Sequence, residues 1–200
     1  MSAFLSWVVV TLIVITTVGL LLARNWRWLT IFLSIQYVGM FILTLQLLPL
    51  GMATVKVITG WMSAAILGMT SSNLSEAAEE EPQSILPQGR FFRLAAAFIV
   101  GLIAYTGAPY VNSMMADAGM TVAAGSLLLI GMGLLHLCIT DEVLRVTIGL
   151  MTILSGFEII YAAVESSVLV AALLAIINLG LALVGSYLML ASSAQGMEPV

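Results

Sequence analysis

Residues 143–190 read VLRVTIGLMTILSGFEIIYAAVESSVLVAALLAIINLGLALVGSYLML, and this stretch decides the fold. Two long apolar runs lie on either side of a short turn at 165–167. A hydrocarbon core of about 30 Å needs roughly 20 helical residues, because each residue adds about 1.5 Å. The stretch therefore predicts two transmembrane helices joined by a tight turn. Each carries one strongly polar residue at depth, Glu158 and Asn178.

The same apolar pattern extends through the whole chain. Of its 200 residues, 62% are hydrophobic and 8% are charged, whereas a soluble domain carries roughly 25% charged residues. This deficit predicts a surface that faces lipid. Seven apolar runs are predicted transmembrane helices: 4–22, 29–48, 52–70, 91–110, 121–139, 143–164 and 168–190. The predicted fold class is all-α, a polytopic transmembrane bundle of about seven helices with no extramembrane catalytic domain.

The basic residues predict the orientation of the bundle. Arg24 and Arg27 follow the first predicted helix, Arg90 and Arg93 precede or open the fourth, and Arg145 opens the sixth. With seven helices, all three places fall on one side, and the positive-inside rule makes that side cytoplasmic. We therefore expect the N-terminus outside and the C-terminus in the cytoplasm, in the inner membrane of a prokaryotic cell.

One segment interrupts the apolar pattern. Residues 71–88 read SSNLSEAAEEEPQSILPQ, and their prolines, glutamates and small polar residues are typical of a linker. We predict a three-helix membrane unit at 1–70, a cytoplasmic acidic linker at 71–90 and a four-helix membrane unit at 91–200.

Composition also bears on cofactors and partners. The chain has one cysteine, Cys138, and one histidine, His136. These are too few for a zinc site, an iron–sulfur cluster or a bis-histidine haem. We therefore predict no cofactor and no bound metal. Nucleic acid is not an expected partner, because the sequence contains no basic patch.

Three polar side chains inside the predicted helices are candidates for a site: Glu158, Asn178 and Lys56. A charge near the bilayer centre costs about 2.5–3.5 kcal/mol on insertion scales, so such residues are functional candidates by default. Glu158 lies about 12 Å and Asn178 about 18 Å from the turn that joins their helices. This difference leaves the two side chains within direct or water-bridged reach. Lys56 enters the membrane from the same side.

These residues have a functional and a structural interpretation. In the first, Glu158 exchanges a proton in a hydrated relay, and Asn178 or Lys56 tunes that exchange. In the second, Glu158 is a protonated or hydrogen-bonded packing residue, and Lys56 extends its long stem to the outer surface. His136, near the cytoplasmic end of its helix, is a weaker candidate for proton uptake; its simpler role is a local hydrogen bond beside acidic residues.

Short motifs in the C-terminal part indicate a family. A charged loop follows the fifth predicted helix, Ile148-Gly149-Leu150 lies early in the sixth, and Gly180 to Leu183 read GLAL in the seventh. With these motifs, residues 127–190 resemble subunit K of proton-pumping NADH–quinone oxidoreductase, and the similar part extends over about 121–192. The extra N-terminal helices, with Lys56-Val57 in the third, make the chain more similar to component E of the group-four membrane hydrogenases.

The chain departs from these families at their acidic positions. Subunit K has a glutamate directly after its Gly-Leu, where this chain has Met151, and its second membrane glutamate falls on about Ile176. Component E has an acid and a histidine that fall on Leu154 and Glu158. Positions 151, 154 and 158 share one helical face. Either an acidic group has moved along this face, or the proton pathway is lost and the subunit only seals the assembly.

The resemblance implies a small membrane-arm subunit of a complex I-like redox pump, a membrane hydrogenase or a related cation/proton antiporter. Such a subunit helps to carry or couple protons and has no catalytic residues of its own. Its implied partners are larger antiporter-like membrane subunits and the lipid bilayer. A structural assembly subunit and a self-contained small transporter are the alternatives. The transporter is disfavoured because the sequence shows no inverted repeat.

The predicted orientation can be tested with tags. A tag at the N-terminus and a tag between Glu76 and Gln88 should report opposite compartments, because three helices separate them and the arginines lie on one side only. Protease protection of the two tags in intact cells and in inverted vesicles measures this. Equal protection of both tags would contradict the seven-helix topology.

Overall fold

The computed structural model describes residues 3–75, 89–115, 118–165 and 167–195, and this part of the chain is helical. Its helices are α1 (Ala3–Leu22), α2 (Trp26–Thr44), α3 (Leu50–Ser75), α4 (Arg90–Met114), α5 (Met120–Ile139), α6 (Val143–Val164) and α7 (Val168–Gln195). All seven are long and apolar enough to cross a membrane. The prediction of an all-α, multi-pass transmembrane bundle is therefore confirmed.

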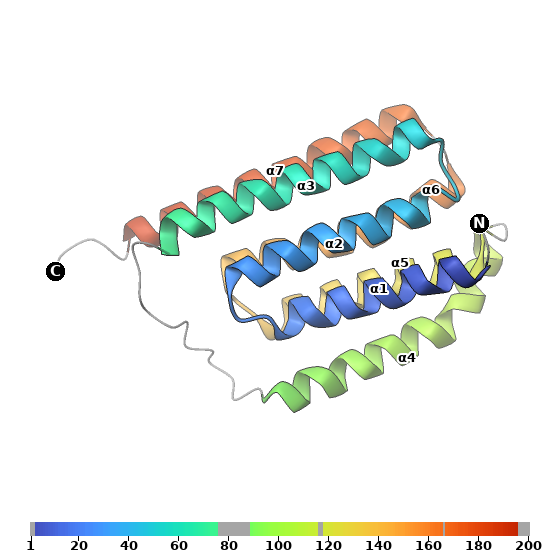
Figure 1. Cartoon of the computed structure of the whole chain (residues 1–200), viewed down its shortest axis with the longest axis horizontal. Helices are drawn as coiled ribbons and strands as arrows, with labels where there is room; N and C mark the ends of the chain where they lie inside the picture. Colours follow the sequence, from blue (N-terminus) through green and yellow to red (C-terminus); the bar gives the residue numbers. More distant parts are fainter. Residues whose placement is uncertain (1–2, 76–88, 116–117, 166, 196–200) are drawn as a thin grey trace.

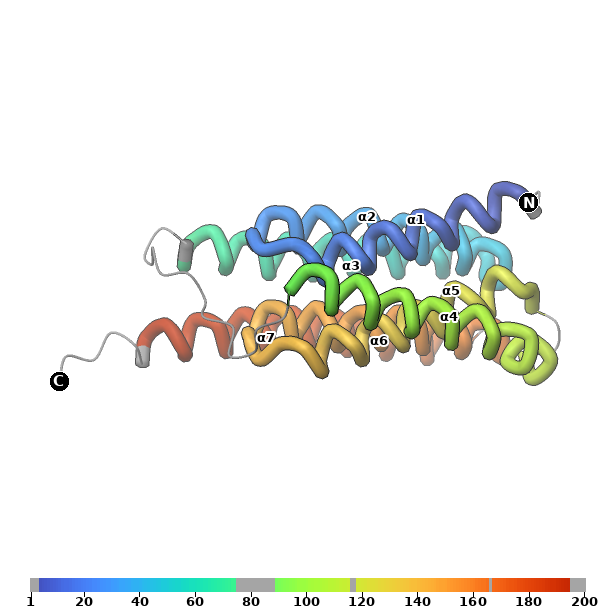
Figure 2. The backbone as a smooth tube through the Cα atoms, turned by 90° about the horizontal axis from the view of Figure 1, so that it is seen from below, coloured from blue at the N-terminus to red at the C-terminus, as the bar shows by residue number. Residues whose placement is uncertain are grey.

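The helices form two layers (Figures 1 and 2). Helices α1, α2 and α3 lie in one layer, and α5, α6 and α7 lie in the other, so that α1 packs on α5, α2 on α6 and α3 on α7. The helices stacked in this way run in the same direction. Helix α4 lies at one edge, against α5 and α1. The interface between the layers is where polar side chains can avoid lipid.

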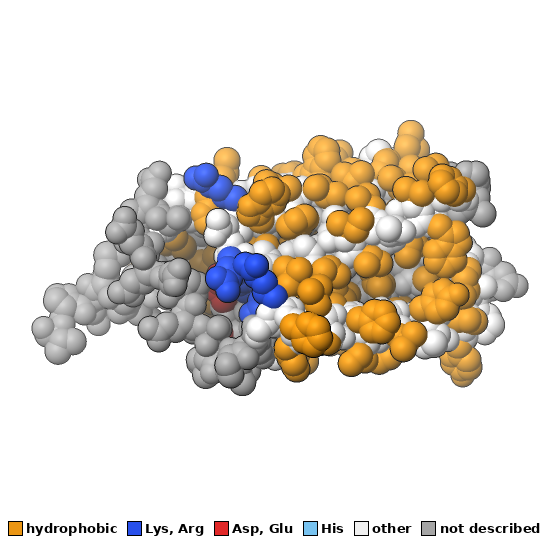
Figure 3. Space-filling model, turned by 60° about the horizontal axis from the view of Figure 1, so that its bottom comes forward, with side chains coloured by type: hydrophobic (Ala, Val, Ile, Leu, Met, Phe, Trp, Pro, Cys, Tyr) orange, Lys and Arg blue, Asp and Glu red, His pale blue; other side chains and the backbone are white. Residues whose placement is uncertain are grey.

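Charge marks one end of the bundle. Arg24, Arg27, Arg90, Arg93 and Arg145 all lie at or near the start of α2, α4 or α6, which share one end in Figure 1. Figure 3 shows basic side chains, which are arginines, gathered at this end, beside a surface dominated by hydrophobic side chains. We call this end the arginine-rich end. The opposite end, with the α2–α3 and α6–α7 turns, is the arginine-poor end.

Several helices extend beyond their predicted ends, and local bonding explains why. The Asn25 carbonyl accepts the first backbone bonds of α2, from Trp28 and Leu29, so the helix begins before residue 29. Helix α3 continues to Ser75, into the predicted linker at 71–90, and the Ser72 hydroxyl donates back to the Met69 carbonyl at 3.0 Å. Polarity alone does not end a helix that leaves the membrane. The rest of the predicted linker, 76–88, lies outside the described residues.

Glycines let α5 and α6 approach closely. A Cβ placed on Gly156 would lie 2.7 Å from the Ser126 carbonyl oxygen, and one on Gly133 would lie 2.8 Å from the Gly149 carbonyl oxygen. Both obstacles are backbone atoms, which cannot rotate away. In lipid, where apolar burial drives helices together only weakly, such close contact supplies the van der Waals packing that holds them. The α5–α6 contact therefore fixes the position of α6.

A glycine substitution should test this contact. Gly156→Ala forces α5 and α6 apart, and overpacking of this kind destabilises by about 1–3 kcal/mol. The matched control is Gly180→Ala, because a Cβ there meets nothing within 4 Å. Thermal unfolding of the detergent-purified variants should show a clear loss for G156A and little change for G180A. Equal behaviour of the two variants would contradict the close packing of α5 on α6.

Candidate functional site

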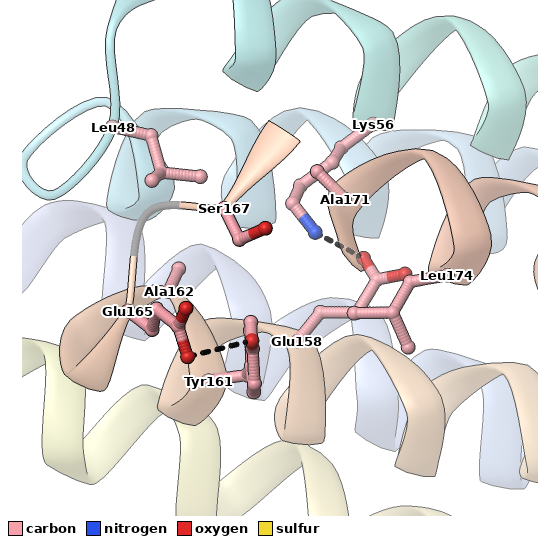
Figure 4. Close-up of a pocket in the computed structure, with 9 residues that line it drawn as sticks. All are labelled: Leu48, Lys56, Glu158, Tyr161, Ala162, Glu165, Ser167, Ala171 and Leu174. Carbon is pink, nitrogen blue, oxygen red and sulfur yellow. Dashed lines mark hydrogen bonds and ion pairs between the residues drawn. The ribbon is translucent and has the colours of Figure 1, made fainter. Parts of the chain in front are cut away.

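A buried ion pair joins the two layers. Lys56 on α3 places its Nζ 2.9 Å from Oε2 of Glu158 on α6, and the two side chains are 4% and 5% exposed. Figure 4 shows them pointing toward one another from opposite layers. The pair is buried inside the protein as well as within the span of the transmembrane helices. Each charged group has therefore lost its hydration, and in return it has one opposite charge beside it in a medium of low dielectric.

Helix geometry explains how the two charges meet. Glu158 lies about 9 Å along α6 from its end at Val164, and Lys56 lies about 9 Å along α3 from its start at Leu50. Both helix ends are at the arginine-poor end of the bundle. The two residues therefore have the same depth, and the stacking of the layers brings their faces together.

A second polar contact lies deeper in the same interface. Tyr37 on α2 donates its hydroxyl to Oδ1 of Asn178 on α7 at 2.8 Å, and the Ser63 hydroxyl on α3 donates to the Asn178 backbone oxygen at 3.4 Å. Tyr37 and Asn178 are 2% and 3% exposed. A Cβ on Gly60 would overlap the Tyr37 ring, so this glycine makes room for the aromatic side chain. The contact connects α2, α3 and α7.

A third contact links α2 to α6. The Gln36 side-chain amide donates from Nε2 to the Thr152 hydroxyl at 3.3 Å, while its Oε1 is buried without a partner in the part of the chain that the structure describes. The Thr152 and Ser155 hydroxyls donate back to carbonyls of their own helix, each at 2.8 Å. Together the three contacts give the layer interface a polar centre between apolar walls.

The ion pair lies beside a small cavity at the arginine-poor end. Its lining includes the polar residues Lys56, Glu158, Glu165 and Ser167. Leu48, Tyr161, Ala162, Ala171 and Leu174 complete the lining. Tyr161 donates its hydroxyl to Glu165 Oε2 at 3.1 Å (Figure 4).

The structure shows where each candidate residue proposed from the sequence lies and what it contacts. Lys56 turns inward to Glu158 instead of extending to the outer surface. Asn178 was predicted to be the partner of Glu158 from its depth in the membrane. In the structure it instead accepts a hydrogen bond from the Tyr37 hydroxyl. His136 is buried in the last turn of α5, near the arginine-rich end and therefore apart from the pair, and its Nε2 has no partner among the described residues. Cys138 is exposed.

Sequence reasoning missed the contribution of α2. Gln36 and Tyr37 are adjacent residues with polar groups near the middle of an apolar helix, and both are buried. Their position in the span was a usable signal, but neither is charged, and a tyrosine in a membrane helix is most often interfacial. Ser63 and Thr152 gave a weaker signal, because such hydroxyls commonly bond their own helix.

The arrangement suits proton chemistry better than metal binding. A lysine beside a single carboxylate supplies one oxygen donor group and one competing cation, whereas metal ions in proteins take several ligands. Among the described residues, no cluster of three or more histidine, cysteine or acidic side chains is placed to hold a metal ion. A buried amine and carboxylate, by contrast, can share or exchange one proton.

Comparison with known proteins gives no further identification. Neither models of protein families nor curated proteins nor solved structures match this chain.

The energetic role of the ion pair can be tested by removing one charge or both. Lys56→Met leaves Glu158 buried without its cation, which should destabilise the protein by about 3–5 kcal/mol. Lys56→Met with Glu158→Leu replaces the pair by apolar side chains and should recover most of that loss. Thermal unfolding in detergent gives both values. If the double variant is at least as unstable as the single one, the charges do not act as a pair.

Proposed function

We propose that the protein is a small membrane-arm subunit of a complex I-like ion-pumping redox complex, a membrane hydrogenase or a related cation/proton antiporter. In this role it contributes to proton translocation or to its coupling and carries out no substrate chemistry. Larger antiporter-like membrane subunits are its proposed partners, and a prokaryotic inner membrane is its proposed location. The short motifs in residues 127–190 support this family of complexes.

The observation that carries the proposal is the buried Lys56–Glu158 pair. Two charges inside a membrane-spanning bundle are expensive to insert, and they persist where function requires them. The pair also connects α3 to α6, elements from the two predicted membrane units. A charge that shifts in a neighbouring subunit would act on this pair strongly, because a low dielectric screens it little.

The pair has two charge-balanced states. In one, Lys56 is an ammonium and Glu158 a carboxylate, as the 2.9 Å contact favours. In the other, one proton has moved from Nζ to the carboxylate, which leaves a neutral amine and a neutral acid. A proton taken up from outside the pair instead leaves the ammonium and the protonated acid with one net positive charge. Such a group can hold and release a proton in response to nearby charge.

Glu158→Gln tests the relay directly. It keeps the shape of the side chain and removes the titratable proton, so the assembled parent complex should translocate protons at a small fraction of the wild-type rate. The single variant leaves Lys56 buried without its anion and is therefore expected to be less stable. The double variant Lys56→Gln with Glu158→Gln leaves no unpaired charge buried, so it should assemble, and it should be equally impaired in proton translocation. Asp141→Asn, which neutralises an exposed carboxylate at the arginine-rich end, is the control.

The outcomes separate the candidate functions. Normal assembly and normal pumping in the double variant would assign the pair a packing role and make the protein a structural subunit. Purification in mild detergent addresses the other alternative: a subunit should elute with larger membrane proteins, whereas a self-contained transporter should elute alone and transport ions in liposomes.

A further inference from the structure

The cavity beside the ion pair reaches toward one end of the bundle only. Its wall runs from Glu158 along α6 to Glu165, the residue that follows α6, and includes Ser167 at the start of α7 (Figure 4). Glu165 is exposed, whereas Glu158 is buried. The cavity therefore lies between a carboxylate inside the bundle and a carboxylate at its arginine-poor surface.

The cavity is large enough for one water molecule, and polar residues form part of its wall. Its volume is about 10 Å³, close to the smallest that can hold one water molecule. A buried water needs two to four polar partners, and Lys56, Glu158 and Ser167 all contribute to the wall. One water at this place could connect the Glu158 carboxylate to the surface beside Glu165.

On the opposite side of the pair, the side chains that follow along α6 are buried. From Glu158 toward the arginine-rich end, the same face of α6 presents Ser155, Met151 and Ile148 at helical spacings of three and four. Met151 and Ile148 are 0% exposed, and Ser155 is 2% exposed. Tyr37, which is held by Asn178, is also fully packed at this level of the interface.

We propose that Glu158 exchanges its proton with water at the arginine-poor end through this cavity, and that the path toward the arginine-rich end is closed. The bridging water gives one proton to the carboxylate and takes one from surface water, so each transfer conserves atoms and charge. Glu165, held by Tyr161, lies at the mouth and attracts cations to it. The use of this path rests on the proposed function, but the access itself does not.

Cysteine labelling tests the access without any transport assay. In a Cys138→Ala background, Ala171→Cys places a thiol on the cavity wall, and Ala172→Cys places one on the exposed lipid-facing side of α7 at the same depth. Thiols react as thiolates, which form in contact with water. A membrane-impermeant charged methanethiosulfonate should label A171C at least about ten-fold faster than A172C.

Two further variants test from which end of the bundle the cavity can be reached. Glu165→Cys at the mouth should label only from the compartment that the arginine-poor end faces, and A171C should label from that compartment alone. Thr147→Cys, a buried position of α6 near the arginine-rich end, should resist labelling from both sides. Equal rates for A171C and A172C would overturn the water access, and rapid labelling of T147C from the other side would overturn the closure.

Failure of this proposal is distinguishable from failure of the proposed function. If A171C labels quickly but Glu158→Gln pumps normally, the cavity is wet and the relay role is wrong. If A171C labels no faster than A172C but Glu158→Gln does not pump, the relay role stands and its proton reaches Glu158 by another route.

Discussion

Burial of two opposite charges between two layers of helices is the constraint on which this structure depends. Neither Lys56 nor Glu158 can face lipid without a large cost, and each is provided with its partner by a helix from the other layer. The contact fails if α3 and α6 shift by one turn relative to each other, because the distance of 2.9 Å leaves no room for such a shift. The ion pair thus sets the register of the two layers, while glycines set the side-by-side spacing of α5 and α6 within one layer.

The fold was predictable because the bilayer imposes it. In lipid, backbone groups must bond within their own segment, so an apolar run of sufficient length is a helix almost without regard to its individual residues. The run at 143–164 matches α6 at both ends. Boundaries outside the hydrocarbon core follow other rules: Asn25 starts α2 early, and Ser72 supports α3 within a segment that composition marks as a linker. Outside the core, contact with water and local hydrogen bonds determine where a helix begins and ends, and hydropathy does not predict either of them.

The candidate site was predictable only in part. A sequence indicates how deep a residue lies in the membrane, but it does not indicate which neighbouring helix the side chain points toward. Spacing from the turns places Lys56 and Glu158 in the same half of the membrane and Asn178 about one helical turn deeper. The structure brings all three into one interface. Which of them touch depends on the stacking of α3 and α6, helices far apart in sequence and not joined by a short turn. Tyr37 takes the place beside Asn178 because Gly60 opens space for its ring, a relation between two helices that neither helix reveals alone.

The position of the pair within the bundle also bears on why a partner subunit is part of the proposal. Glu158 lies about 9 Å along its helix from the arginine-poor end, and packed Met151 and Ile148 occupy the next turns of the same face. A proton that crosses a hydrocarbon core of about 30 Å therefore needs further groups beyond this face. A small subunit that holds one titratable pair near one surface is well suited to pass a proton or an electric field to a neighbour. A buried pair with access on one side couples to that neighbour most strongly when the other side stays dry, because water there would screen the interaction.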